Sequence, residues 1–250
     1  LKTAAFEFLA GGKNCKIGGI CKGSGMIHPN MGTMLAFITT DCAIDSALLQ
    51  ETLREVVRVS FNRVSVDGDT STNDMCVVLA NGLAGNATIT GRDIEWKSFY
   101  DALEAVCVSL AKQIAADGEG ASRMITCTVR GASDENTAET LAKSVCSSSL
   151  LKAAMFGADA NWGRVLCAMG YSGAEFDPEA VDVKFRSDKG EISVCESGRA
   201  VGFSEETAKE ILLADSVEIL IDVHLGGCEV TAWGCDLTYD YVKINGDYRT

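Results

Sequence analysis

Apolar and polar residues alternate along the first part of the chain in patterns that predict strands and one helix. Apolar residues recur on both sides of the Gly11-Gly12 turn, which indicates a β-hairpin over residues 1–21. Met34–Ile38 is a short apolar run that fits a strand buried on both faces. Asp45 can cap an amphipathic helix that follows it and reaches Phe61. We therefore expect a sheet covered by at least one helix.

The rest of the chain also mixes strand and helix patterns. The expected elements are a strand at Met75–Ala80, a helix at Ser98–Ala116, a strand at Arg123–Gly131, a helix from Asp134, a hairpin at 181–195, a helix at Ser204–Leu213 and a second hairpin at 217–233 across Gly226-Gly227. Strands and helices do not alternate as βαβ repeats. This mixture predicts an α+β architecture with layered antiparallel sheets flanked by helices.

Composition narrows the classes of function. A chain of 250 residues can bury one large core or two small ones. Its net charge of −13 excludes nucleic acid and anionic membranes as main partners, and its apolar runs are too short for a membrane helix. Eleven cysteines without a Cys-x-x-Cys pair, beside only two histidines, argue against a metal site. We expect reduced, mostly buried thiols and a cytoplasmic location.

Thr33 lies where a loop rich in glycine meets the predicted strand at Met34. A hydroxyl at such a junction suits a nucleophile, although position alone favours a hydroxyl that only caps the start of the strand. A threonine hydroxyl needs a base, and neither His28 nor His224 belongs to a Ser-His-Asp motif. An amino-terminal threonine would instead use its own α-amine, whose reference pKa is about 7.7–8.0. Gly32 would leave the preceding carbonyl unshielded for the attack that frees this amine.

Three polar motifs each allow two interpretations. Asp67–Asp74 lacks the spacing of a calcium loop, so it forms either a self-satisfied turn or a loop beside an active site. Glu119 stands between Gly118 and Gly120, which could let the backbone approach a ligand or could simply end a helix. In the motif Asn161–Arg164, a guanidinium beside an aromatic ring could bind a carboxylate, but packing is the simpler interpretation.

Several long motifs in the same order identify a family. The stretch Lys22-Gly-Ser-Gly-Met-Ile-His-Pro-Asn-Met-Gly-Thr33-Met-Leu resembles the cleavage-site signature of the ornithine acetyltransferases, also called bifunctional glutamate N-acetyltransferases. The resemblance extends through Asp67–Asp74, Gly118–Ala121, Asn161–Arg164 and Asp236–Thr250, and so covers essentially the whole chain. It implies a fold similar to the DmpA and ornithine acetyltransferase type of amino-terminal-nucleophile enzyme.

The resemblance implies a reaction and a set of site residues. The precursor would cut itself between Gly32 and Thr33, and Thr33 would carry the acetyl group from N2-acetylornithine to glutamate in arginine biosynthesis. Lys22, Thr33, Glu119, Asn245 and Thr250 match substrate-binding positions. The expected segments are the end of the amino-terminal part at 1–32, the nucleophile-bearing core at 33–175 and a C-terminal part at 176–250.

The resemblance also implies partners. The family has a large amino-terminal segment that supplies an oxyanion-stabilising Thr-Gly pair, so this chain is expected to be a fragment that needs that segment. Two cut copies would form a hetero-tetramer of two alpha and two beta chains. No cofactor is implied, although acetyl-CoA is an acetyl donor for some members. The alternatives are an amino-terminal-nucleophile peptidase or amidase, and an inactive fragment.

Overall fold

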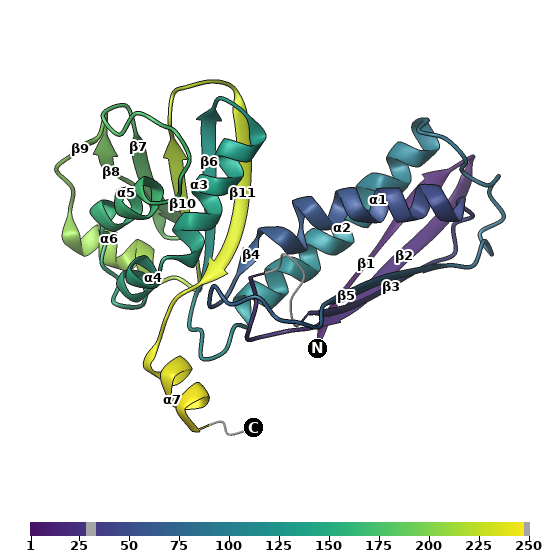
Figure 1. Ribbon diagram of the computed structural model, residues 1–250, viewed down its shortest axis with the longest axis horizontal. Coiled ribbons are helices and arrows are strands. Elements are labelled where there is room, and N and C mark those ends of the chain that lie inside the picture. The colour runs from purple at the N-terminus through teal and green to yellow at the C-terminus, as the bar shows by residue number, and fades with distance from the viewer. Residues whose placement is uncertain (29–33, 248–250) are drawn as a thin grey trace. The chain divides into compact units, whose positions relative to one another are not determined.

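The computed structural model describes residues 1–28 and 34–247, which form two compact units (Figure 1). The first unit comprises Leu1–Arg63 and Asp69–Ile114, and the second comprises Val64–Gly68 and Ala115–Thr250. These units are defined by packing, whereas the predicted segments 1–32, 33–175 and 176–250 follow the cleavage site. The predicted segments therefore remain a prediction.

The first unit contains one four-stranded sheet and two long helices. Its elements are β1 (Lys2–Ala10), β2 (Lys13–Lys22), β3 (Leu35–Thr40), α1 (Ser46–Val59), a 3-10 turn (Phe61–Arg63), β5 (Met75–Ala80) and α2 (Ile94–Ala116). The sheet order is β1-β2-β3-β5, antiparallel except for the parallel pair β3–β5. The predicted hairpin is confirmed, and Gly11 and Gly12 turn it with φ angles of 55° and 73°.

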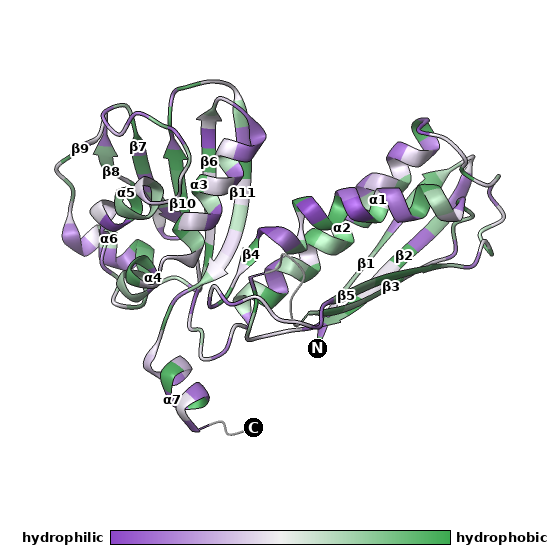
Figure 2. Cartoon of the chain, viewed as in Figure 1, coloured by the Kyte–Doolittle hydropathy of each residue, from purple (hydrophilic) through white to green (hydrophobic). Residues whose placement is uncertain are grey.

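Both helices of the first unit cover the same face of the sheet (Figure 1). The predicted cap of α1 is confirmed, because the Asp45 carboxylate accepts hydrogen bonds from Ala47 N at 3.0 Å and Leu48 N at 3.1 Å. Purple and green segments alternate along α1 in Figure 2, as expected for an amphipathic helix. The predicted apolar stripe of α2, with Leu103, Val106, Leu110 and Ile114, is fully buried.

The opposite face of this sheet is open and apolar. Five large side chains point away from the helices and are 41–66% exposed: Leu9, Ile20, Phe37, Met75 and Leu79. The expectation that Met34–Ile38 forms a strand buried on both faces is therefore wrong for one face. In β3, buried Ala36 and Ile38 alternate with exposed Phe37 because only one side of the sheet meets helices.

The second unit contains a seven-stranded sheet and five helices among the described residues. Its elements are β4 (Val64–Ser65), β6 (Met124–Ala132), α3 (Glu135–Ser147), α4 (Ser149–Phe156), α5 (Trp162–Gly170), β7 (Asp182–Ser187), β8 (Gly190–Glu196), β9 (Arg199–Ala200), α6 (Glu205–Leu212), β10 (Ser216–Asp222), β11 (Cys228–Cys235) and α7 (Tyr239–Asp247). The sheet order is β4-β11-β6-β10-β7-β8-β9.

The predicted hairpin at 217–233 is wrong. β6 lies between β10 and β11, parallel to β10 and antiparallel to β11. The chain turns at Gly226, where a Cβ atom would lie 2.5 Å from the Ala132 carbonyl oxygen at the end of β6. The two glycines therefore carry the chain past β6 instead of closing a tight turn. The α+β class itself is confirmed, with both antiparallel and parallel strand pairs in its sheets.

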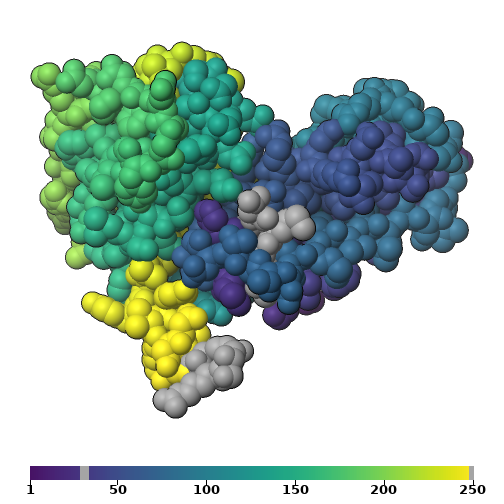
Figure 3. All heavy atoms as spheres, viewed as in Figure 1, coloured from purple at the N-terminus to yellow at the C-terminus, as the bar shows by residue number. Residues whose placement is uncertain are grey.

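One hydrophobic core lies between this sheet and α3, α5 and α6. Ile125, Val129, Ile219 and Phe185 contribute from the strands and are fully or almost fully buried. In Figure 3 the near side of the second unit consists mainly of teal and green residues, the part of the chain that holds α3–α5. No helix among residues 1–28 and 34–247 combines the length and apolar character needed to cross a membrane.

The other face of the seven-stranded sheet carries charged side chains in pairs. Arg186 Nε donates to Glu218 Oε2 at 2.8 Å, and Arg130 Nε donates to Asp222 Oδ2 at 2.7 Å. Lys184 Nζ lies 3.2 Å from Glu191 Oε1 on the neighbouring strand. These pairs join strands that are adjacent in the sheet, so opposite charges lie side by side along this face.

Candidate functional site

Three of the predicted site residues, Gly32, Thr33 and Thr250, lie outside the described residues. The residues on either side of the predicted cleavage site, His28 and Met34, are described. The predicted substrate residues Lys22, Glu119 and Asn245 are described as well.

Met34, the residue after Thr33, is fixed on both sides of its backbone. Its N–H donates to the Asp74 carboxylate, and its carbonyl accepts from Met75 N at 2.8 Å. Its side chain is only 3% exposed. The parallel pairing of β3 with β5 begins at the next residue, Leu35, opposite Met75. β3 thus begins at Leu35, two residues after Thr33, which itself lies outside the described residues.

The polar run Asp67–Asp74 contacts both flanks of the predicted cleavage site. Thr70 Oγ1 donates to the His28 carbonyl oxygen at 3.0 Å, and the Asp74 carboxylate accepts from Met34 N. Within the run, Asn73 N donates to Ser71 Oγ at 3.3 Å. Of the two interpretations, the hydrogen bonds favour a loop packed beside the candidate site over a turn that only satisfies itself.

Asp74 is an unusual carboxylate within the part of the chain that the structure describes. Burial raises the pKa of Asp74, and the hydrogen bond from Met34 N acts against that rise. Its second oxygen, Oδ2, is buried and has no hydrogen-bond partner among the described residues. Asp74 also borders a cavity of about 370 Å³ that Gln50, Arg54 and Asn62 help to line. Sequence reasoning noted the polar run but did not single out this residue.

Lys22 ends β2 and pairs across the sheet with Leu35, two residues after Thr33. Its side chain is exposed. The structure therefore places this ammonium at the end of the sheet where β3 starts, within the first unit. A cation at this position can attract the carboxylate of a small anionic substrate.

Glu119 and Asn245 lie together in the second unit. Asn245 Nδ2 donates to Glu119 Oε2 at 3.0 Å, and it also donates to the Tyr241 carbonyl oxygen at 3.0 Å. The two residues are 126 positions apart in the sequence, and no pattern in the spacing predicts their contact. Both were assigned to substrate binding by the family resemblance alone. The structure thus brings together two of the predicted site residues.

The glycines around Glu119 are required by contacts within the protein. A Cβ atom on Gly118 would lie 2.7 Å from Cys235 Sγ, and one on Gly120, whose φ is 67°, would lie 2.5 Å from Tyr241 N. Thr238 Oγ1 donates to the Gly120 carbonyl oxygen at 2.5 Å. The loop is therefore pressed between β11 and the start of α7. The proposed close approach to a ligand is not needed to explain the two glycines.

Lys152 was not identified from the sequence. Its side chain is 2% exposed, and its ammonium donates to the Val66 carbonyl oxygen and lies 3.7 Å from Cys235 Sγ. Burial raises the pKa of the Cys235 thiol, and the nearby Lys152 charge acts against that rise. Lysine is usually exposed, so no sequence pattern could identify Lys152 as a buried residue beside Val66 and Cys235.

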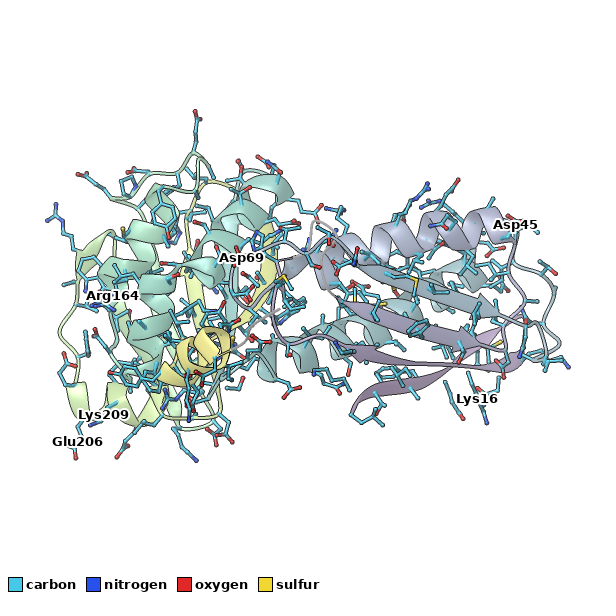
Figure 4. The ribbon with its side chains drawn as sticks, turned by 60° about the horizontal axis from the view of Figure 1, so that its bottom comes forward. Lys16, Asp45, Asp69, Arg164, Glu206 and Lys209 are labelled. Carbon is cyan, nitrogen blue, oxygen red and sulfur yellow. The ribbon has the colours of Figure 1, made fainter. Side chains whose placement is uncertain are left out.

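The Asn161–Arg164 motif makes structural contacts within the second unit. Asn161 caps α5 by accepting a hydrogen bond from Arg164 N at 3.1 Å. The Arg164 guanidinium donates to the Leu150 carbonyl oxygen in α4 at 2.8 Å. Arg164 is labelled in Figure 4, as is Asp69 of the polar run. The motif joins two helices of the second unit.

The cysteines match their expected chemistry. All eleven are free, and eight are buried, while Cys167 is exposed. Within residues 1–28 and 34–247, no group of three or more histidine, cysteine or carboxylate side chains is placed to hold a metal ion.

Comparisons with known proteins give a consistent result. A model of the ArgJ family matches residues 1–250. The arginine biosynthesis bifunctional protein ArgJ of Symbiobacterium thermophilum is 55% identical over 249 residues, which cover 100% of this chain and 61% of the relative. The protein of the same name from Geobacillus kaustophilus is 53% identical over 250 residues, which cover 100% of this chain and 60% of the relative. The chain thus spans about 60% of the length of these curated relatives.

A solved structure shares the fold. The crystal structure of the arginine biosynthesis bifunctional protein argJ from Bacillus halodurans matches with a TM-score of 0.82 and 49% identity, covering 86% of this chain and 100% of that chain. The expected fold and the family resemblance are both confirmed. Because the family model matches the whole chain and the relatives share about half of its residues, the chain belongs to the ArgJ family.

Proposed function

We propose that the protein containing this chain is a self-cleaving acyltransferase of arginine biosynthesis. It transfers an acetyl group from N2-acetylornithine to glutamate and releases ornithine and N-acetylglutamate. The observation that carries this proposal is the hydrogen bond between Glu119 and Asn245, because it joins two residues that the resemblance assigned independently to substrate binding. The printed name of the relatives, arginine biosynthesis bifunctional protein, supports the same pathway.

The first chemical step is scission of the Gly32–Thr33 bond. The Thr33 hydroxyl attacks the Gly32 carbonyl carbon, the C–N bond breaks, and the hydroxyl proton passes to the departing nitrogen. The resulting ester is hydrolysed by water, which leaves Thr33 with a free α-amine and a free hydroxyl. That amine can then accept the hydroxyl proton in each later attack, because its reference pKa lies near neutral pH, at about 7.7–8.0.

Acetyl transfer then proceeds in two half-reactions. The Thr33 hydroxyl attacks the acetyl carbonyl of N2-acetylornithine, and ornithine leaves with the proton on its amine. The glutamate amine next attacks the acetyl-threonine ester, and the proton returns to the threonine oxygen. Each attack passes through an oxyanion, for which the family supplies a Thr-Gly pair outside this chain.

The described residues suit binding of amino-acid substrates. The exposed Lys22 ammonium can hold a substrate carboxylate, and the Glu119 carboxylate can hold an ammonium. Asn245 fixes the orientation of Glu119 through its side-chain amide. No cofactor is needed for these steps, and acetyl-CoA is proposed only as a second acetyl donor. The eleven free thiols support the proposed cytoplasmic location.

We propose the amino-terminal segment of the precursor as the partner of this chain. The apolar open face of the first unit supports this, since exposed apolar patches of this kind usually meet a partner. The proposed assembly is a hetero-tetramer of two alpha and two beta chains.

The test is an assay of both reactions on a completed chain, in which residues 1–250 are joined to the unmatched part of the Symbiobacterium relative. We expect transfer of labelled acetyl from N2-acetylornithine to glutamate, and its loss in Thr33→Ala. Glu119→Gln and Asn245→Ala should raise the KM for amino-acid substrates by about 10-fold or more, because each loses a charge-assisted hydrogen bond. Release of acetate without any N-acetylglutamate would identify an amidase and reject the transferase.

A further inference from the structure

The short helix that carries Asn245 has little hydrophobic anchoring within this chain. α7 comprises nine residues, Tyr239–Asp247, and none of them is buried. It follows β11 near the C-terminal end of the chain (Figure 1). Two of its large side chains, Tyr239 and Val242, are 83% and 67% exposed. Helices shorter than about 12–15 residues are only marginally stable alone, so the position of Asn245 depends strongly on contacts at the start of α7.

Thr238, the residue directly before α7, joins this helix to the loop that carries Glu119. Its hydroxyl oxygen accepts hydrogen bonds from the N–H of Asp240 at 3.1 Å and of Tyr241 at 3.4 Å, and so caps the helix. The same hydroxyl donates to the Gly120 carbonyl oxygen at 2.5 Å. The Thr238 side chain is buried, at 7% exposure, so little water competes for these bonds.

We propose that Thr238 is a positioning residue for substrate binding, because it fixes the orientation of Glu119 and Asn245 relative to one another. This inference rests on the proposed function, in which these two residues bind the amino-acid substrates. The family resemblance assigned no role to Thr238. Thr238 acts through the two side chains and is not itself a contact of the substrate.

The contacts of Thr238 lead to both side chains of the pair. Gly120 directly follows Glu119, so a hydrogen bond to the Gly120 carbonyl oxygen holds the backbone beside Glu119. A Cβ atom on Gly120 would lie 2.5 Å from Tyr241 N, which shows how closely the loop approaches the helix. The Tyr241 carbonyl oxygen accepts from Asn245 Nδ2 at 3.0 Å, and that amide also donates to Glu119 Oε2. The Thr238 hydroxyl therefore holds both partners of this hydrogen bond.

The residues just before Thr238 are held by the interior of the second unit. The Asp236 side chain is fully buried and accepts a hydrogen bond from Ser122 N at 2.8 Å, at the end of the Glu119 loop. Leu237 N donates to the Lys152 carbonyl oxygen at 3.2 Å. These contacts do not involve the Thr238 hydroxyl. Loss of that hydroxyl should therefore loosen α7 and the loop while the core keeps its structure.

The experiment measures steady-state acetyl transfer by the completed chain, with N2-acetylornithine as the varied substrate. Thr238→Val keeps the shape of the side chain and removes its hydroxyl. It should raise the KM by about 5- to 10-fold and leave kcat within about 3-fold of the parent chain, because it weakens substrate binding and not the attack on the acetyl group. Thr238→Ser keeps the hydroxyl, so its KM should lie within about 2-fold of the parent value.

Two further measurements separate positioning from a general loss of stability. In a Glu119→Gln background, Thr238→Val should raise the KM by less than about 2-fold more, because both changes act on one contact. Ser204→Ala is the matched control, since Ser204 Oγ caps α6 by accepting from Thr207 N at 3.2 Å. It should lower the melting temperature as Thr238→Val does and leave the KM unchanged. Amide hydrogen exchange should become faster in α7 of Thr238→Val but not in β6.

The outcomes distinguish the positioning role from the proposed function. A parent-like KM in folded Thr238→Val, with a raised KM in Glu119→Gln, would overturn the positioning role alone. An equal rise in KM with and without Glu119→Gln would overturn it too, since the effect would not pass through Glu119. If Thr238→Val does not fold, Thr238→Ala replaces it, and failure of both to fold would show that the hydroxyl serves folding instead. A parent chain that forms no N-acetylglutamate, or a parent-like KM in Glu119→Gln, would instead count against the proposed function.

Discussion

The two units of this chain each present one sheet face that carries no helices, and the two faces differ in chemistry. On the four-stranded sheet this face displays Leu9, Ile20, Phe37, Met75 and Leu79, all at least 41% exposed. On the seven-stranded sheet it displays ion pairs such as Arg130–Asp222 and Arg186–Glu218. Contact of the first face with water is unfavourable because its side chains are apolar. The charges of the second face are paired with one another and remain hydrated.

This difference indicates which sheet is complete within the chain. Paired charges on adjacent strands need no cover, and each exposed pair contributes little, about 0–1 kcal/mol. An open apolar face, by contrast, is stabilised by a second layer, and a groove of about 790 Å³ between residues such as Gly18, Thr39 and Leu79 follows it. The curated relatives are longer than this chain, and we propose that their additional segment supplies that layer.

The largest expected effect comes from adding the proposed amino-terminal segment. The chain alone should be nearly inactive in acetyl transfer, and the completed chain should be about 10³-fold more active or better, because loss of even one oxyanion donor costs about 10²–10³ in kcat. The measurement is N-acetylglutamate formation by the two proteins at equal concentration. Binding of an apolar dye should fall on completion, as the open face becomes covered. Full turnover by residues 1–250 alone would show that the sheet needs no second layer.

The next effect compares neighbouring residues on opposite faces of β3. Ile38→Ala removes a fully buried side chain from the helix-covered face and should lower the free energy of unfolding by about 2–5 kcal/mol. Phe37→Ala, on the open face, should cost about 1 kcal/mol or less in the chain alone. Urea unfolding of both variants tests this. In the completed chain Phe37→Ala should become distinctly more costly, and an unchanged cost would mean that nothing covers Phe37.

A smaller effect is expected when a charge is placed on each open face. Phe37→Lys should weaken binding of a separately produced amino-terminal segment by at least about 10-fold, because it buries an unpaired ammonium in the proposed interface. Ser193→Lys, beside Glu196 on the charged face, is the matched control and should leave binding unchanged. Binding is measured by titration calorimetry. If both variants weakened binding equally, the amino-terminal segment would not bind specifically to the apolar face.

Local sequence patterns predicted where the helices and strands form better than they predicted which strands pair in the sheets. The hairpin at 1–21, the Asp45 cap and the buried stripe of α2 all follow from neighbours within a few residues, and all three are confirmed. The hairpin at 217–233 was wrong because β10 and β11 each pair with β6, about 90 residues or more earlier in the chain. Sequence spacing carries no signal for such non-local pairing.

The candidate site shows the same limit. Glu119 and Asn245 could be linked only through the family resemblance, and the structure then showed their contact. Lys152 was missed because burial of a lysine depends on partners such as the Val66 carbonyl, which no motif reveals. The run at Asp67–Asp74 was noticed for its composition. Its contacts, hydrogen bonds to the His28 carbonyl and the Met34 N–H, could not be predicted from that composition. Thr33 stays a prediction that the proposed experiments must test.

The smallest expected effect concerns pH and the charged face. Burial alone would raise the pKa of Asp182, but hydrogen bonds from Ser197 N and the His224 ring hold it below its ordinary value. A carboxyl whose pKa is lowered by folding adds stability above its unfolded pKa, about 3.9, and loses it as the pH falls through the folded value.

Asp182→Asn should therefore lower the free energy of unfolding by less than about 1 kcal/mol at pH 7, and this gap to the parent chain should close below about pH 4. Urea unfolding at several pH values measures this gap, and Asp188→Asn on the exposed turn after β7 is the control. A gap that widens on acidification would mean that this face is stabilised by something other than its hydrated ion pairs.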